Sequence, residues 1–95
     1  MSNNGTYQKQ RVVITGLGVI TPVGNNVAET WEGIVNGRSG LGPITLMNND
    51  EHTVGGVCEV KNFDADEALG RREARRRDRT QQLATVAARE AMAQA

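Results

Sequence analysis

The stretch from Arg11 to Asn26, RVVITGLGVITPVGNN, constrains the fold of this chain more than any other part of it. It opens with the β-branched run Val12-Val13-Ile14, which is typical of a buried β-strand. Gly16 and Gly18 follow, and glycines placed there indicate that the backbone turns tightly or approaches another segment closely. Pro22 then ends any continuous strand ladder. The stretch therefore predicts a strand, a glycine turn, a loop and the start of a helix.

The two glycines resemble the start of a dinucleotide-binding fingerprint, but the spacing argues against one. That motif requires a third glycine or alanine three residues after the second. The position holds Thr21, followed by Pro22, and the chain is not yet helical there. We therefore do not expect nucleotide binding, and we predict no cofactor.

A helix is expected directly after this stretch. Asn26 and Glu29 have the spacing of an N-terminal capping box. Apolar residues recur at helical spacing from residue 27 to about residue 36, and Gly37 is placed to end the helix. Trp31 lies in this apolar stripe, so we expect it to anchor a hydrophobic core.

The middle of the chain predicts a loop followed by a broken strand. Residues 37–53 are rich in glycine, serine, asparagine and aspartate, and we assign no role to the single histidine there, His52. Residues 54–60 (VGGVCEV) read as a second strand interrupted by two glycines. Cys58 lacks a partner base in sequence, so we expect a buried, inert cysteine rather than a nucleophile. No metal site is predicted.

Two further helices are expected in the last third of the chain. Asp64 and Glu67 have capping spacing and open a short helix that Gly70 ends or interrupts. A long helical pattern then runs to Ala95, with small residues on the expected buried side, which predicts a central packed helix. That side comprises Leu83, Ala84, Ala87, Ala88, Ala91 and Met92.

The segment between these helices is strongly basic. Six of the nine arginines lie within residues 71–79, and with Glu73 and Asp78 they leave a local charge of +4. On one continuous helix, four of them share a face, while Glu73 can pair with Arg77 one turn on. Such a face is either a solvated surface with local ion pairs or, because the four charges repel one another, a site for an anionic partner. The four are Arg72, Arg75, Arg76 and Arg79.

Either nucleic acid or an acidic protein could bind such a face. Single-stranded nucleic acid usually also requires stacking aromatic residues, and none is interleaved with these arginines. The formal net charge of the whole chain is zero, so it shows no general bias towards nucleic acid or membranes. An acidic helix of a second protein also fits the basic face.

Size and composition limit what the chain can be. Ninety-five residues with three aromatic side chains form at most one small domain with a thin core. The final helical pattern has no stop signal, which predicts a segment of a longer protein. One cysteine, a polar leader at residues 1–10 and no apolar run near the ~20 residues of a membrane span predict a soluble, cytoplasmic protein.

The order of these motifs resembles the N-terminal region of the type II β-ketoacyl-acyl carrier protein synthases, in the thiolase superfamily. The resemblance is carried by VVITGLG, then TPVG, then Trp31, then NGRSG at residues 36–40. It covers most of residues 11–95. It implies an α/β chain, the N-terminal part of a thiolase-like layered α/β/α/β/α fold that is incomplete here.

The resemblance also implies a function. Members of the family extend an acyl chain held on a cysteine by decarboxylative condensation with malonyl-acyl carrier protein. Their catalytic cysteine, two histidines and lysine lie beyond the matched region, so we assign no catalytic residue here and expect this segment alone to be inactive. The resemblance implies a homodimer and no cofactor or metal.

In the family, a basic segment forms part of the docking surface for the acidic acyl carrier protein. The match places Arg72, Arg75 and Arg76 on the basic docking positions. Arg77 departs from the family's usual methionine or leucine, and Thr80 replaces a frequent phenylalanine. Two other interpretations stay open, namely a non-catalytic synthase-like subunit such as a chain-length factor, and a small basic-helix nucleic-acid-binding protein.

Overall fold

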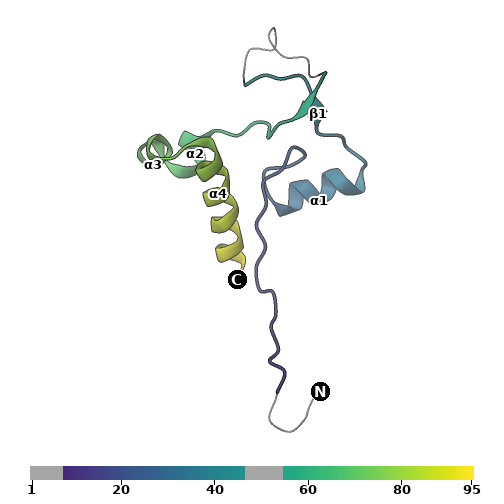
Figure 1. The fold of residues 1–95 in the computed structure, drawn as a ribbon, viewed down its shortest axis with the longest axis vertical. Coiled ribbons are helices and arrows are strands. Elements are labelled where there is room, and N and C mark those ends of the chain that lie inside the picture. The colour runs from purple at the N-terminus through teal and green to yellow at the C-terminus, as the bar shows by residue number, and fades with distance from the viewer. Residues whose placement is uncertain (1–7, 47–54) are drawn as a thin grey trace.

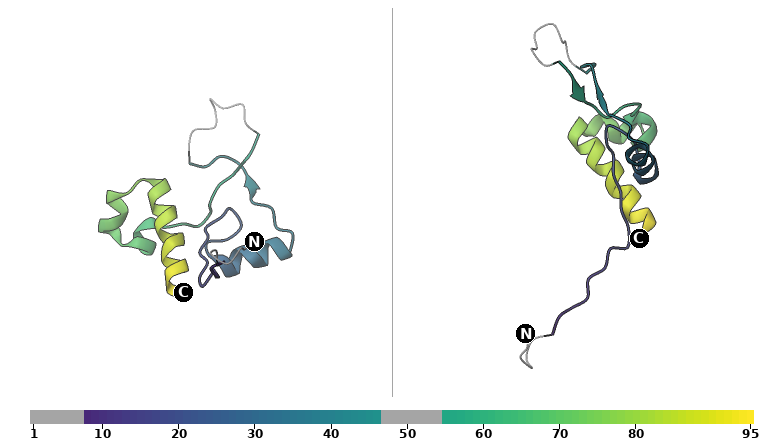
Figure 2. Two further views of the ribbon diagram at one scale, coloured as in Figure 1. Left: turned by 60° about the horizontal axis from the view of Figure 1, so that its bottom comes forward. Right: turned by 90° about the vertical axis from the view of Figure 1, so that its right-hand side faces the viewer.

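The computed structural model describes residues 8–46 and 55–95. The three C-terminal helices lie together, and the extended N-terminal segment runs between α4 and α1 (Figure 1, Figure 2). His52, Val54 and residues 1–7 of the expected leader lie outside the described residues. The elements in chain order are α1 (Val27–Val35), β1 (Leu41–Gly42), β2 (Val57–Cys58), α2 (Ala65–Leu69), α3 (Arg71–Arg76) and α4 (Arg79–Gln94).

The N-terminal segment lies directly against α4 at its two glycines. A side-chain carbon at Gly18 would overlap the carbonyl oxygen of Ala87 and lie 2.7 Å from the amide nitrogen of Ala91. One at Gly16 would overlap the carbonyl oxygen of Ala91 and lie 2.9 Å from the amide nitrogen of Ala95. Of the two possibilities read from the sequence, close approach is therefore confirmed, because only glycine fits at these positions.

Side chains of α4 also bind the backbone of this segment. Gln94 Oε1 accepts the Leu17 amide at 2.6 Å, and Glu90 Oε1 accepts the Val19 amide at 3.0 Å. The second oxygen of Glu90 accepts the amide of Val27, the first residue of α1, at 3.0 Å. The amides at a helix start lack partners within the helix and favour a negative charge. Glu90 therefore joins the N-terminal segment, α1 and α4.

The strand predicted at residues 12–14 is not formed. Residues 11–20 pair with no other strand in the described part of the chain, and Val12 and Ile14 are 90% and 81% exposed. Because Gly16 already lies beside Ala95, the residues before it run past the end of α4 (Figure 1). A β-branched run favours extended backbone, but a strand also needs a neighbour to complete its ladder.

A compact turn at residues 21–24 connects this segment to α1. The Thr21 amide donates to the Gly24 carbonyl at 2.8 Å, and the Gly24 amide donates to the Thr21 hydroxyl at 3.1 Å. The hydroxyls of Thr21 and Thr30 lie 3.0 Å apart. Thr30 and Gly33, one turn apart, are the buried residues of α1. The helix thus faces the turn with a hydroxyl and a glycine.

Both ends of α1 form as the sequence predicts. The side chain of Asn26 accepts the Glu29 amide at 2.8 Å, and the Glu29 carboxylate accepts the Asn25 amide at 2.9 Å. Gly37 has a φ of 68° and donates its amide to the Ile34 carbonyl at 3.1 Å, which closes the last turn.

The apolar stripe of α1, however, is exposed. Trp31, Ile34 and Val35 are 66%, 59% and 64% exposed. The prediction that Trp31 anchors a core is therefore wrong for the described residues. Periodicity identifies which face of a helix is apolar, but it does not say which segment covers that face.

The second predicted strand forms over only two residues. Val57 and Cys58 pair with β1 in an antiparallel ladder, with Leu41 opposite Cys58. The thiol of Cys58 is exposed, so its predicted burial is wrong. A ribbon of two strands with two residues each is too short to bury the side chains that alternate across it.

The C-terminal helices hold the small described core. Asp64 caps α2 by accepting the Asp66 and Glu67 amides at 3.0 and 3.3 Å, and Gly70, with a φ of 84°, ends it as predicted. Leu69 and Ala74 are the buried apolar residues, at 7% and 6% exposure. The predicted thin core is confirmed in the described part of the chain.

The prediction of a central packed helix is confirmed only in part for α4. Its small residues do allow close packing, because Ala87 and Ala91 face the glycines of the N-terminal segment. None of its residues is fully buried, and Ala84, Ala88 and Met92 are exposed. The helix is packed along one narrow side rather than centrally.

We expect Gly18→Ala to lower the free energy of unfolding by about 1–3 kcal/mol, because the added methyl group collides with the Ala87 carbonyl. Gly55→Ala is the matched control, since no atom of residues 8–46 or 55–95 lies within 4 Å of a side-chain carbon there. Chemical denaturation of both variants checks this. Equal losses in the two variants would show that Gly18 makes no close contact.

We expect Glu90→Ala to cost about 1–3 kcal/mol of unfolding free energy, because two backbone amides lose their acceptor. Glu32→Ala, at an exposed position of α1, should change stability little. Chemical denaturation of both variants, measured side by side, tests whether Glu90 stabilises the fold through these two amides. A Glu90 variant as stable as the Glu32 variant would contradict it.

Candidate functional site

The basic segment folds into the short helix α3. Arg72, Arg75 and Arg76 all lie in it and are all exposed. Their spacing of three and four residues places them on one face of the helix. The structure therefore brings the three arginines selected from the sequence together on an accessible surface.

Arg79 does not belong to this face. The helix ends at Arg76, Arg77 is extended, and the Asp78 carboxylate accepts the Gln81 amide at 2.9 Å to start α4. The guanidinium carbon of Arg79 lies 5.0 Å from the centre of the Phe63 ring. The predicted four-arginine stripe is therefore wrong in its fourth member, because an aspartate that caps a new helix interrupts the old one.

The predicted pairing of Glu73 with Arg77 is confirmed. Arg77 Nη2 and Nε lie 3.1 and 3.2 Å from Glu73 Oε2. Such a half-exposed pair contributes little to stability. The pair matters for the charge of α3, because Glu73, the one acidic side chain of that helix, is neutralised by Arg77, which lies just outside it.

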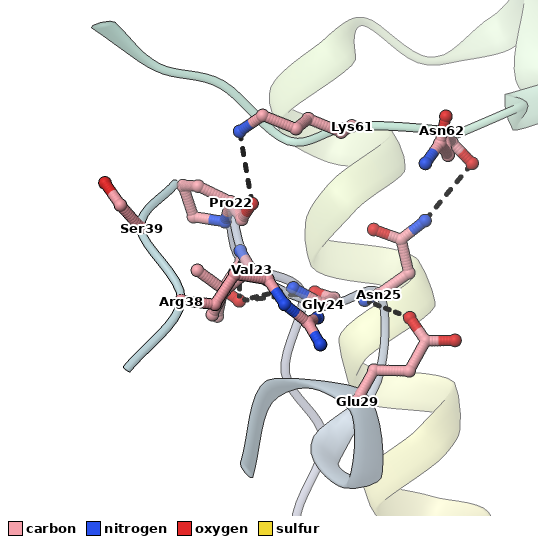
Figure 3. Close-up of a pocket in the computed structure, with 10 residues that line it drawn as sticks. Pro22, Val23, Gly24, Asn25, Glu29, Arg38, Ser39, Lys61 and Asn62 are labelled. Carbon is pink, nitrogen blue, oxygen red and sulfur yellow. Dashed lines mark hydrogen bonds between the residues drawn. The ribbon is translucent and has the colours of Figure 1, made fainter. Parts of the chain in front are cut away.

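A polar cavity of about 410 Å³ lies beside the turn at residues 21–24 (Figure 3). Lys61 Nζ donates to the carbonyls of Gly40, Glu59 and Pro22 at 2.6, 3.1 and 3.2 Å. These bonds use all three donors of the ammonium group. Lys61 therefore ties together the loops that surround the cavity, and its ammonium group has no donor left for a ligand.

A second part of the cavity wall is also held by an internal bond. The Asn25 side-chain amide donates to the Asn62 carbonyl at 3.2 Å (Figure 3). Asn62 has a φ of 57°, which asparagine tolerates better than most residues. Sequence reasoning missed the roles of Lys61 and Asn62, because their partners are backbone groups of distant loops that no motif announces.

Glu59 holds the loop that follows β1. Its carboxylate accepts the Thr45 hydroxyl at 2.7 Å, the Thr45 amide at 3.2 Å and the Leu46 amide at 3.3 Å. The Thr45 hydroxyl is the main cause that lowers the pKa of Glu59 from 4.5; desolvation opposes it, and the two amides and Lys61 add smaller lowering effects.

We expect an NMR titration of Glu59 to give a midpoint below 4.5. A lowered pKa means that the loop contact stabilises the fold above pH 4.5 and is lost as the pH falls through the folded-state pKa. Thr45→Val removes the hydroxyl and should raise the pKa towards 4.5. A midpoint that does not move in this variant would show that the hydroxyl is not the cause.

Residues 9–95 match the family model of the β-ketoacyl synthase N-terminal domain. The chain therefore belongs to the β-ketoacyl synthase family, and the predicted resemblance is confirmed. Membership implies a thiolase-like fold, of which the described residues form a small mixed part of helices and short strands.

The curated relatives narrow this further. The chain is 45% identical over 85 residues, 90% of its length, to a 3-oxoacyl-[acyl-carrier-protein] synthase 2 from Synechocystis sp. and to one from Staphylococcus aureus (strain COL). The match covers 20% of each relative, so the chain spans about a fifth of their length. By their name, these relatives are synthases of 3-oxoacyl-acyl carrier protein. Across the described ranges, every helix is too short or too polar for a membrane span.

Proposed function

We propose that this chain is the N-terminal segment of a 3-oxoacyl-acyl carrier protein synthase II. The whole protein would lengthen an acyl chain by decarboxylative condensation with malonyl-acyl carrier protein in fatty acid biosynthesis. The match over residues 9–95 and the names of the relatives support this proposal. The catalytic cysteine, histidines and lysine implied by the resemblance lie outside this chain, so the segment contributes binding and packing surfaces rather than chemistry.

The observation that carries the proposal is the basic face of α3. Arg72, Arg75 and Arg76 are exposed, and among residues 8–46 and 55–95 the one ion pair joins Glu73 to Arg77. Within the described residues, no ion pair therefore offsets the charge of these three guanidinium groups, and that charge is available to a partner. Arginines presented together attract an acidic helix and speed its association through electrostatic steering. We assign these three residues to the docking of acyl carrier protein.

The exposed apolar side chains support the assignment to a larger domain. Val12 and Ile14 are more than four-fifths exposed, and Trp31 is two-thirds exposed. Clusters of large apolar side chains on a surface usually mark contacts with further polypeptide. We propose that the rest of a layered α/β/α/β/α domain covers them. By the same resemblance, the whole protein would be a cytoplasmic homodimer.

We expect reversal of all three charges, by Arg72→Glu, Arg75→Glu and Arg76→Glu together, to raise KM for acyl-carrier substrates of the full-length protein by about tenfold or more, because attraction becomes repulsion. The turnover rate at saturation should stay nearly unchanged. Steady-state kinetics at two salt concentrations measure both quantities, and the difference from the unmodified protein should shrink in high salt.

Arg89→Glu is the control for charge reversal, because Arg89 is exposed on α4 and away from α3. An unchanged KM in the triple variant would remove the docking assignment. A full-length protein that binds acyl carrier protein without condensing activity would instead identify the non-catalytic, chain-length-factor type of subunit.

A further inference from the structure

We propose that Gln82 of α4 is a positioning residue for carrier-protein docking, since it fixes the end of α3 on which the arginines are carried. This inference rests on the proposed function of that helix. It concerns a residue that has no charge and lies outside the basic segment. Its role follows from the contacts that hold the arginine helix in place.

The helix α3 cannot hold its own shape. It has six residues, and isolated helices shorter than about 12 residues are marginal in water. Its N-terminal neighbour Gly70 makes no side-chain cap, and its C-terminal neighbour Arg77 is already extended. The direction in which the arginines point therefore depends on contacts from other parts of the chain.

Gln82 supplies such a contact at the C-terminal end of α3. Its side-chain amide nitrogen, Nε2, donates to the Ala74 carbonyl at 2.9 Å and to the Arg77 carbonyl at 3.1 Å. These bonds use both donors of the amide group. The carbonyls at a helix end otherwise lack partners, and the amide of Arg77 reaches the Ala74 carbonyl only at 3.4 Å. Gln82 thus makes the shorter bond at this end.

The two carbonyls lie on either side of two of the three docking residues. Arg75 and Arg76 are the only residues between Ala74 and Arg77 in the chain. Ala74 is 6% exposed and belongs to the described core, so the contact ties the arginines to the best-packed part of the chain. A bond on each side of a dipeptide restrains its backbone, and hence the direction of both side chains.

The start of α4, which carries Gln82, is itself held in place. Gln82 lies in the first turns of α4, which Asp78 caps, and Arg79 in the same turn packs over the Phe63 ring. Arg79 is therefore held towards the protein rather than offered to a partner. The start of α4 acts as a fixed support from which one amide group holds the arginine helix.

The test compares two neighbouring glutamines in the full-length protein. Gln82→Met keeps the size of the side chain but removes both donors. We expect KM for malonyl-acyl carrier protein to rise about three- to tenfold, as for the loss of one or two net hydrogen bonds, with kcat nearly unchanged. Gln81→Met is the matched control at an exposed position of the same helix and should leave both constants unchanged.

Two further variants separate orientation from charge and from stability. Gln82→Lys keeps a donor, whereas Gln81→Lys combined with Gln82→Met carries the same charge without one. We expect the first to bind the carrier protein better than the second. Gln82→Asn, one methylene shorter, should show a smaller rise in KM and serves if Gln82→Met does not fold.

The outcomes distinguish this inference from the proposal beneath it. If the triple arginine reversal raises KM but Gln82→Met and Gln82→Asn do not, the role of Gln82 is refuted while the docking assignment stands. A fall in kcat as large as the rise in KM would make Gln82 a general stabilising residue and would also refute it. If the triple reversal leaves KM unchanged, the docking assignment itself fails.

Discussion

The close approach of a glycine backbone to α4 is the contact on which the rest of the described structure depends. Gly16 and Gly18 admit the helix so closely that any side chain would overlap its carbonyls. At that separation Glu90 and Gln94 can reach the backbone amides of the segment. Glu90 extends the same contact to the first amide of α1. One residue pair without side chains thus determines how three segments meet.

The candidate site is built in the opposite way, from side chains that support a helix too short to support itself. A capping carboxylate begins α4, a guanidinium packs on an aromatic ring, and an amide holds the end of α3. The arginines that face solvent make none of these contacts. Because other side chains support α3, no ion pair within the described residues offsets the charges of Arg72, Arg75 and Arg76. An acidic partner could then meet a surface whose geometry is already set.

The sequence predicted local features well and the covering of surfaces poorly. The caps at Asn26 and Asp64 and the pair of Glu73 with Arg77 involve residues within one turn, so spacing alone defines them. Trp31 was predicted to be buried because its stripe is apolar, but burial needs a second segment. The fourth arginine was misplaced because Asp78 starts a new helix, and a continuous helical pattern conceals such a break.

By itself, then, the sequence determined the family, the helix caps at Asn26 and Asp64, and the basic positions Arg72, Arg75 and Arg76, to whose face it wrongly added Arg79. Each of these depends on residue types at short, fixed intervals. Only the tertiary structure decided that the glycines lie against α4, that Lys61 ties together the loops around the cavity and that Gln82 holds the end of α3. The physical reason is that these contacts join side chains or glycines to backbone groups of other elements or loops. Backbone groups are the same in every residue, so no pattern of side chains identifies which of them will be the partner.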